Sequence, residues 1–176
     1  SQDVADAKER LSITAAETAD AALTAATTAQ TAAQTAKEAL TPEDTNVEIS
    51  DAEAKGQLAK EAAAVYVAKA GLESDAAGIY KTAADEAKTD ADSQEAAAQI
   101  AFDKAVAANE IAEDGTEIAT STVSAEQTAL VAAKTAVVVA VAEVVTADAA
   151  VSAADQEETN AGNLQTTITT LDEAIE

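Results

Sequence analysis

The chain has 176 residues and a formal net charge of −23, from 33 acidic and 10 basic residues. Hydrophobic residues make up 48% of it, but 51 of them are alanine, and aromatic residues make up only 2% of the chain. Such a composition argues against a large globular core of bulky side chains. It favours helices that pack closely over small side chains.

The residue types that are missing exclude most enzyme classes. Without histidine and cysteine, the chain cannot form a zinc finger, a thiol nucleophile, a histidine-based triad or a disulfide framework. Its acidic charge would repel nucleic acids and anionic membranes. We therefore predict a protein that is not an enzyme, has no cofactor and binds no nucleic acid.

The N-terminal part is predicted to be one long helix over residues 1–40, rich in alanine and threonine. It ends before Pro42, the only proline of the chain, because proline cannot continue a helix. Residues 41–50 are predicted to form a loop. Ser50 with Glu53 matches a capping box, so the next helix is expected to begin directly after this loop.

The middle of the chain, residues 51–113, is predicted to form a helical hairpin region. A second capping box, Asp92 with Glu95, divides it into helices over 51–89 and 93–113. Glycines inside the first of these helices are expected to mark a bend or a close crossing of helices. They are Gly56, Gly71 and Gly78.

The C-terminal part is predicted to contain a turn at 114–123, a valine- and alanine-rich helix at 124–159 and a short helix at 160–176. Ser124 with Gln127 matches a helix start. An Asn-Ala-Gly-Asn segment separates the last two helices, because these residues favour turns.

The most apolar stretch of the chain lies at residues 136–142. It is bounded by Lys134 and Glu143 and is too short to span a bilayer. We therefore predict no membrane span. Six valines among residues 137–145 also fit a strand, so helix and strand both remain open for this stretch.

Apolar residues recur with a heptad period on three of these segments, which predicts helices that pack side by side. On the first segment, steps of four and three residues connect an alanine seam: Ala15, Ala19, Ala22, Ala26, Ala29, Ala33 and Ala36, followed by Leu40. On the second, the heptad residues are Leu58, Val65, Leu72 and Ile79. On the valine-rich segment they are Leu130, Val137, Val144 and Val151, and four further valines widen this face: Val131, Val138, Val141 and Val145. The predicted fold is therefore all-α, with long amphipathic alanine-rich helices in an elongated helical bundle or coiled coil.

A threonine row lies opposite the alanine seam of the first helix and consists of Thr24, Thr28, Thr31 and Thr35. No charged residue occurs between Asp20 and Lys37, although 24% of the chain is charged. A solvent-exposed helix face would ordinarily carry charged side chains in such a protein. We therefore expect the alanine seam and the threonine row together to form an interaction face.

The sequence over residues 12–40 resembles the Ala/Thr/Ser-rich coiled-coil stalks of bacteriophage tail and head fibres. This resemblance implies a thin helical rod assembled from several copies, although the chain lacks the glycine- and aromatic-rich β domain of receptor-binding fibres. Segment 23–26, Leu-Thr-Ala-Ala, is similar to the repeat of alanine-rich fish antifreeze proteins, and Thr24 and Thr35, eleven residues apart, would share one helix face. Segment 28–39 is similar to the eleven-residue repeats of desiccation-protectant proteins.

Two acidic clusters are interpreted as solvated surface, so no metal site is predicted. Asp90, Asp92 and Glu95 lack the glycine and the alternating oxygen ligands of a calcium-binding loop. The second cluster surrounds a predicted turn and consists of Glu110, Glu113, Asp114 and Glu117.

These patterns predict a non-enzymatic structural or interaction protein, a helical component of an extracellular or virion assembly such as a fibre or a decoration protein. Its partners are expected to be further copies of itself, joined through the alanine seam, or other structural proteins of the same assembly. The alternative is an ice- or surface-binding protein, or a desiccation protectant, that uses the threonine row.

Overall fold

The computed structural model describes residues 2–41, 46–111 and 117–175. These residues form three helices, α1 (Gln2–Ala39), α2 (Asn46–Ile111) and α3 (Glu117–Glu173). None of the described residues lies in a strand. The all-α prediction is confirmed, and the valine-rich stretch that left helix and strand open is helical.

α2 is a single helix where two were predicted. It begins at Asn46, inside the predicted loop, and continues through Asp92 without a break. Asp92 caps no helix, because it lies inside α2. Its carboxylate accepts a hydrogen bond from the Nζ of Lys88, one turn earlier, at 2.6 Å. The helix continues because neither proline nor glycine interrupts the alanine-rich sequence there. The predicted hairpin within 51–113 is therefore wrong.

α3 is also a single helix where two were predicted. It begins at Glu117, inside the predicted turn at 114–123, and passes through Gly162 to Glu173. The hydroxyl of Thr166 donates to the carbonyl of Gly162 at 2.9 Å, one turn apart, as in an uninterrupted helix. The preceding residue, Ala161, is fully buried. Its packing outweighs the cost of about 1 kcal/mol that glycine imposes on a helix.

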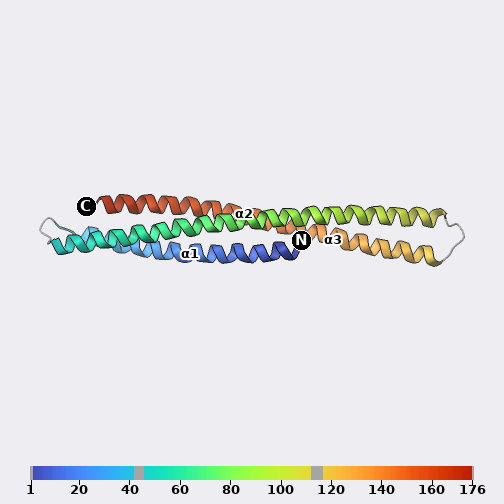
Figure 1. Cartoon of the computed structure of the whole chain (residues 1–176), viewed down its shortest axis with the longest axis horizontal. Helices are drawn as coiled ribbons and strands as arrows, with labels where there is room; N and C mark the ends of the chain where they lie inside the picture. Colours follow the sequence, from blue (N-terminus) through green and yellow to red (C-terminus); the bar gives the residue numbers. More distant parts are fainter. Residues whose placement is uncertain (1, 42–45, 112–116, 176) are drawn as a thin grey trace. The chain divides into compact units, whose positions relative to one another are not determined.

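Contacts divide the chain into two compact units. Unit 2 consists of Lys8–Ile79 and Ala149–Glu176, and unit 1 consists of Ser1–Ala7 and Tyr80–Asp148. In unit 2, segments of all three helices lie side by side (Figure 1). Unit 1 is mainly a hairpin of α2 and α3, to which α1 adds only its first turn.

The core of unit 2 consists mainly of alanine methyl groups. On α1, Ala19, Ala26 and Ala33 have no exposed surface. Ala26 packs against Tyr66 of α2 and Ala161 of α3. Because a methyl group projects little from its helix, such a core lets helices approach closely.

The predicted inner face of α2 is wrong. Its four large residues face solvent, with 52–60% of their surface exposed: Leu58, Val65, Leu72 and Ile79. The residue after each of them is buried instead: Ala59, Tyr66, Glu73 and Tyr80. One residue corresponds to a rotation of the helix by about 100°. Small side chains fill the narrow space between close helices, whereas a row of leucine and valine would force the helices apart.

The predicted inner face of α3 agrees with the structure in part. Leu130 is buried, and Val137, Val144 and Val151 are half-buried. The prediction that four further valines widen this face is wrong, because 41–69% of their surface is exposed: Val131, Val138, Val141 and Val145. α3 therefore contributes one aliphatic face to the core and presents a second one to solvent.

Candidate functional site

The predicted interaction face on α1 divides into a buried and an exposed part. The alanine seam faces inward, with Ala15, Ala22, Ala29 and Ala36 half-buried beside the fully buried Ala19, Ala26 and Ala33. α2 and α3 of the same chain cover this seam in unit 2. The expectation that copies meet through it is corrected, because the chain's own helices already occupy it.

The threonine row forms the exposed part of that face. Thr24, Thr28, Thr31 and Thr35 are all exposed. Each hydroxyl donates to the backbone carbonyl four residues earlier, at 2.8–3.1 Å. These bonds hold the side chains in one orientation and leave an uncharged surface of methyl groups and hydroxyl oxygens.

A buried polar layer joins the helices of unit 2. The hydroxyl of Tyr66 on α2 donates to Oε1 of Glu157 on α3 at 2.6 Å. Burial, the hydrogen bond to Glu157 and nearby negative charges raise the pKa of Tyr66. Burial, together with the charges of Glu157 and Asp20, also raises the pKa of Glu73, which is 7% exposed. A tyrosine that keeps its proton serves here as a hydrogen-bond donor between helices and not as a nucleophile.

Unit 1 contains a similar pair. The hydroxyl of Tyr80 on α2 donates to Oε1 of Glu143 on α3 at 2.8 Å, and Gln2 of α1 donates to the other carboxylate oxygen at 3.3 Å. Lys81 forms an ion pair with Asp148 of α3 at 2.8 Å. The hydrogen bond to Asp148 raises the pKa of Lys81. These contacts fix how α2 and α3 align along each other in this unit.

These tyrosine–glutamate pairs were not predicted from the sequence. Tyr66 and Tyr80 are separated by two heptads (80 − 66 = 14), and so are Glu143 and Glu157 (157 − 143 = 14). Residues that are two heptads apart lie on the same face of packed helices. The equal spacing was therefore the available indication that each tyrosine meets a glutamate.

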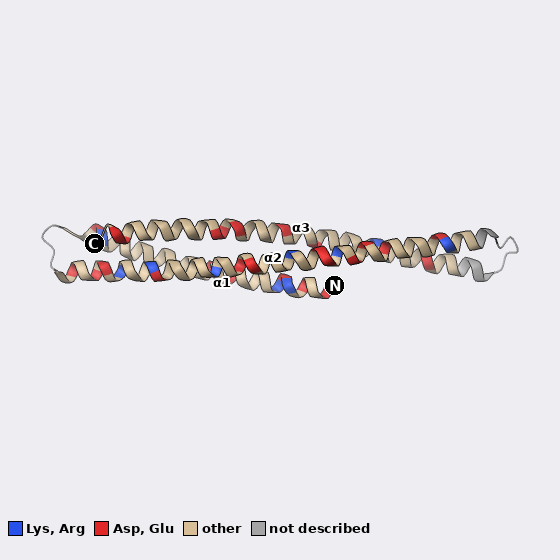
Figure 2. Cartoon of the chain, turned by 45° about the horizontal axis from the view of Figure 1, so that its top comes forward, with Lys and Arg blue, Asp and Glu red and all other residues tan. Residues whose placement is uncertain are grey.

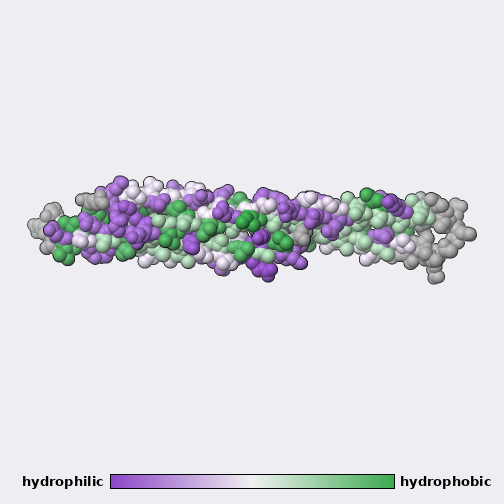
Figure 3. Space-filling view, viewed as in Figure 1, coloured by the Kyte–Doolittle hydropathy of each residue, from purple (hydrophilic) through white to green (hydrophobic). Residues whose placement is uncertain are grey.

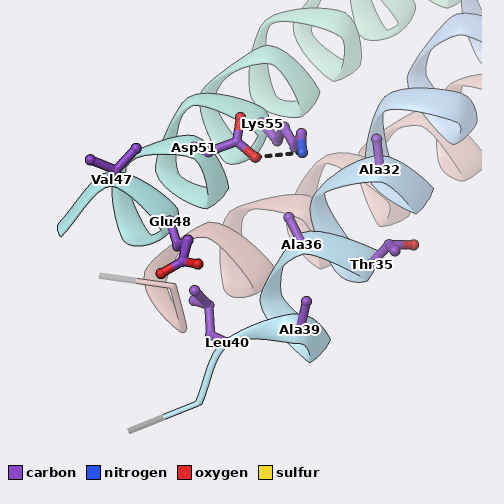
Figure 4. Close-up of a pocket in the computed structure, with 9 residues that line it drawn as sticks. All are labelled: Ala32, Thr35, Ala36, Ala39, Leu40, Val47, Glu48, Asp51 and Lys55. Atoms are coloured by element: carbon purple, nitrogen blue, oxygen red, sulfur yellow. Dashed lines mark hydrogen bonds and ion pairs between the residues drawn. The ribbon is translucent and has the colours of Figure 1, made fainter. Parts of the chain in front are cut away.

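A hollow lies between the last turns of α1 and the first turns of α2 in unit 2 (Figure 4). Methyl groups of α1 form one side of it, with Glu48, Asp51 and Lys55 of α2 on the other. Lys55 and Asp51 form an ion pair at 2.6 Å, and their side chains are 41% and 62% exposed. Water reaches these groups, so nothing in the hollow prepares a carboxylate for acid–base chemistry.

The described residues contain no group of three acidic side chains placed to hold a metal ion. In the first acidic cluster, Asp92 pairs with Lys88. The side chains of the second cluster, at 110–117, lie outside the part of the chain that the structure describes.

Large aliphatic side chains form an exposed surface on each unit. In unit 2 we define the α2 stripe as Leu58, Val65, Leu72 and Ile79. In unit 1 the exposed valines of α3 are Val131, Val138, Val139, Val141 and Val145, with 41–69% of their surface exposed. Figure 3 shows a broad pale green, weakly hydrophobic area over the hairpin of unit 1, and Figure 2 shows long stretches of α3 without charge.

One helical segment, Thr122–Glu173, is long and apolar enough to cross a membrane by length and composition alone. Only 11% of its most apolar window is buried. The corresponding helix in the core of a soluble protein would be mostly buried. Two charged residues interrupt this segment: Lys134 precedes the valines at 137–139, and Glu143 lies between Val141 and Val144. The absence of a membrane span stays a prediction.

Comparison of the chain with protein-family models, with curated proteins and with solved structures gave no match. The function is therefore inferred from the surfaces and contacts described above, since a helical fold alone implies no activity.

Proposed function

We propose that this protein is a non-enzymatic structural and interaction protein, a helical component of an extracellular assembly such as a virion fibre or decoration protein. The observation that supports this proposal is that large aliphatic side chains face solvent while alanines fill the core. Soluble monomers rarely expose long apolar surfaces unless these surfaces bind something.

The α2 stripe suits contact with another helix. Its residues recur every seven positions, which is the spacing of a coiled-coil seam. Each residue is about half-exposed, so covering it contributes about 1 kcal/mol. Four such residues do not offset the entropy lost when two proteins associate. Stable association thus requires further contact surfaces, and the exposed valines of unit 1 supply one.

Two features support an extracellular or virion setting. The composition of residues 12–40 resembles that of phage fibre stalks, and in the structure this segment is helical as far as Ala39. The threonine row leaves α1 with an uncharged outer face on which a neighbouring protein of the assembly can pack without burying charge.

Sedimentation velocity tests the proposal. We expect species larger than the 17.6 kDa chain, and we expect them to grow as salt rises, because screening weakens repulsion between copies of charge −23. Leu72→Asp should weaken association, whereas Ala64→Asp, at an exposed position of α2 outside the stripe, should not. A monomer at every protein and salt concentration would refute the proposal.

Ice or another ordered surface is a second candidate partner, favoured by the fixed side-chain orientation of the threonine row. Wild-type protein would then slow the recrystallisation of ice, and Thr28→Lys would abolish the effect. Ice that grows identically with and without the protein would remove this candidate.

A further inference from the structure

In unit 1 a groove lies between α2 and α3, directly beside the first turn of α1. Ala5 of α1 packs against Ala83 and Ala87 of α2, and Gln2 donates to Glu143 of α3. The hairpin of α2 and α3 runs on past this end of α1 (Figure 1). With Gln2 beside them, the residues that line the groove there are Ala87, Ala91, Gln94, Ala132, Thr135, Ala136 and Val139.

The two walls of this groove have the spacing that receives a helix. On α2 the lining residues follow steps of four and three, 87 to 91 to 94. On α3 they are 132, 135, 136 and 139, the last three of which are three, four and seven residues from the first. Such steps keep the residues on one helix face and form the holes that receive the side chains of a facing helix. Ala132 and Ala136 are exposed, and Val139 is 49% exposed, so this face of α3 is unfilled in the chain by itself.

Unit 2 shows how a helix fills the corresponding space between α2 and α3. There the space between α2 and α3 is filled by α1 through small residues at heptad spacing, Ser12, Ala19, Ala26 and Ala33. In unit 1 Ala5 makes the same kind of contact with Ala83 and Ala87, and Ala87 also lines the groove. The groove is thus continuous with an interface that the structure already contains, and its occupant is expected to be helical.

Charge favours another copy of this chain as that occupant. The lining residues of the groove are all uncharged, although the chain carries a net charge of −23. Between Glu126 and Glu143, α3 carries a single charged residue, Lys134. Two copies that meet here therefore bring few like charges together, whereas contact through the acidic surface elsewhere would be repulsive.

A bilayer fits this unit less well than a protein does. The α2 helix of this hairpin carries two ion pairs, between Lys81 and Asp85 and between Lys88 and Asp92. Insertion of the hairpin would require these charged groups to leave water, which is costly in hydrocarbon. A helical partner covers the groove and leaves those pairs in solvent.

We propose that the hairpins of two copies pack groove to groove in unit 1, so that α2 and α3 of each copy form an antiparallel four-helix bundle. A two-fold axis makes each hairpin both the groove and the occupant. This inference rests on the proposed function and identifies one surface through which copies assemble.

The absence of cysteine from the chain makes this contact easy to measure. Ala136→Cys places a single thiol in the groove, and Ala96→Cys places one at an exposed position of α2 outside it. We expect maleimide to label the thiol at position 136 roughly tenfold more slowly in concentrated than in dilute protein, because burial in the dimer blocks it. Labelling at position 96 should not depend on protein concentration. Equal labelling at position 136 in dilute and concentrated protein would refute the inference.

A charge in the groove provides the second test. Ala136→Glu should weaken self-association roughly tenfold or more, because it buries two unpaired carboxylates in each dimer. Ala96→Glu should self-associate as the wild type does, with the same mass of the associated species in sedimentation velocity. Since Ala136 is exposed in the single chain, both variants should keep the helicity of the wild type by circular dichroism.

The outcomes separate this inference from the proposed function. If Ala136→Glu self-associates as the wild type does, the groove is not the contact, while the proposed function stands on other surfaces. If the wild type is monomeric at every concentration, both proposals fail. If it is monomeric but binds phosphatidylcholine vesicles, the occupant is lipid and the inference is overturned.

Discussion

Glu73 is a carboxylic acid held in the core of unit 2. Burial raises its pKa, and the negative charges of Glu157 on α3 and Asp20 on α1 raise it further. The folded chain therefore binds this proton more tightly than the unfolded chain does. The contribution of Glu73 to stability is then most favourable below the ordinary glutamate pKa of about 4.3, and it is lost as the pH rises through the raised pKa.

Glu73→Gln should remove this pH dependence. The amide has nearly the same shape and carries no charge, so the variant should melt at a higher temperature than the wild type at pH 7. The difference should shrink as the pH falls and vanish at about pH 3, well below the unfolded-state pKa of about 4.3, because the wild-type carboxyl is then protonated in both states. Thermal melts followed by circular dichroism across this range measure both effects. Glu61→Gln, at an exposed position of α2, is the control and should show neither. A lower melting temperature of Glu73→Gln at pH 7 would contradict this account.

Gly56 is the glycine of α2 at which another helix approaches closely. A Cβ placed on it would collide with Oδ1 of Asp172 on α3, and Asp172 also accepts a hydrogen bond from Lys60 at 2.8 Å. Around Gly71 and Gly78, by contrast, no atom lies within 4 Å of such a Cβ. The predicted close crossing is therefore found at one of three glycines.

Gly56→Ala and Gly78→Ala should change stability in opposite directions. At Gly78 alanine meets no neighbour and favours the helix, so the free energy of unfolding should rise by about 0.5–1 kcal/mol. At Gly56 the methyl group displaces Asp172, and we expect a loss of about 1–3 kcal/mol. Urea denaturation at pH 7 measures both values. A stabilised Gly56→Ala would show that Asp172 moves away without cost.

At the scale of the helix, α1 and α2 show when heptad spacing predicts the buried face. On α1 the seam contains only small residues, so the predicted face and the buried face coincide at Ala19, Ala26 and Ala33. On α2 two seams compete, one of large aliphatic residues and one of alanine and tyrosine. The structure buries the second seam, because α2 packs against two other helices in unit 2 and only small or flat side chains fit between them.

Ala26→Glu should destabilise this helix packing strongly. Ala26 has no exposed surface and packs against Tyr66 and Ala161, so glutamate there is both too large and charged. We expect a loss of about 3 kcal/mol or more in the free energy of unfolding. Ala25→Glu introduces the same charge one residue away at an exposed position and should change the stability by less than about 0.5 kcal/mol. Equal melting temperatures for the two variants would mean that this face of α1 is not buried.

At the scale of the whole molecule, the net charge of −23 opposes both folding and association. Some acidic groups pair with lysine, as Asp172 does with Lys60 and Asp148 with Lys81. Ten basic residues cannot pair with 33 acidic ones, however, so net repulsion remains.

The melting temperature should therefore rise with salt. Between about 0.01 and 1 M ionic strength the screening length falls from about 30 to 3 Å, which removes most repulsion between exposed carboxylates. Sodium chloride and potassium chloride should give the same curve if screening is the cause. Melting temperatures that stay constant over this range would exclude self-repulsion as an important contribution to stability.

Composition and local periodicity alone determined that the chain is all-α outside the valine-rich stretch of α3, and which face of α1 points inward. Alanine has the highest helix propensity, and the small residues of the α1 seam leave a single choice of buried face. On α3 two valine seams compete, and the structure buries only one of them. Only the tertiary structure decided that α2 and α3 continue through Asp92 and Gly162, because a cap or a glycine is worth about 1 kcal/mol and the packing of a long helix outweighs it. It also decided that α2 buries alanine and tyrosine and exposes leucine and valine, since that choice depends on the space its neighbouring helices leave.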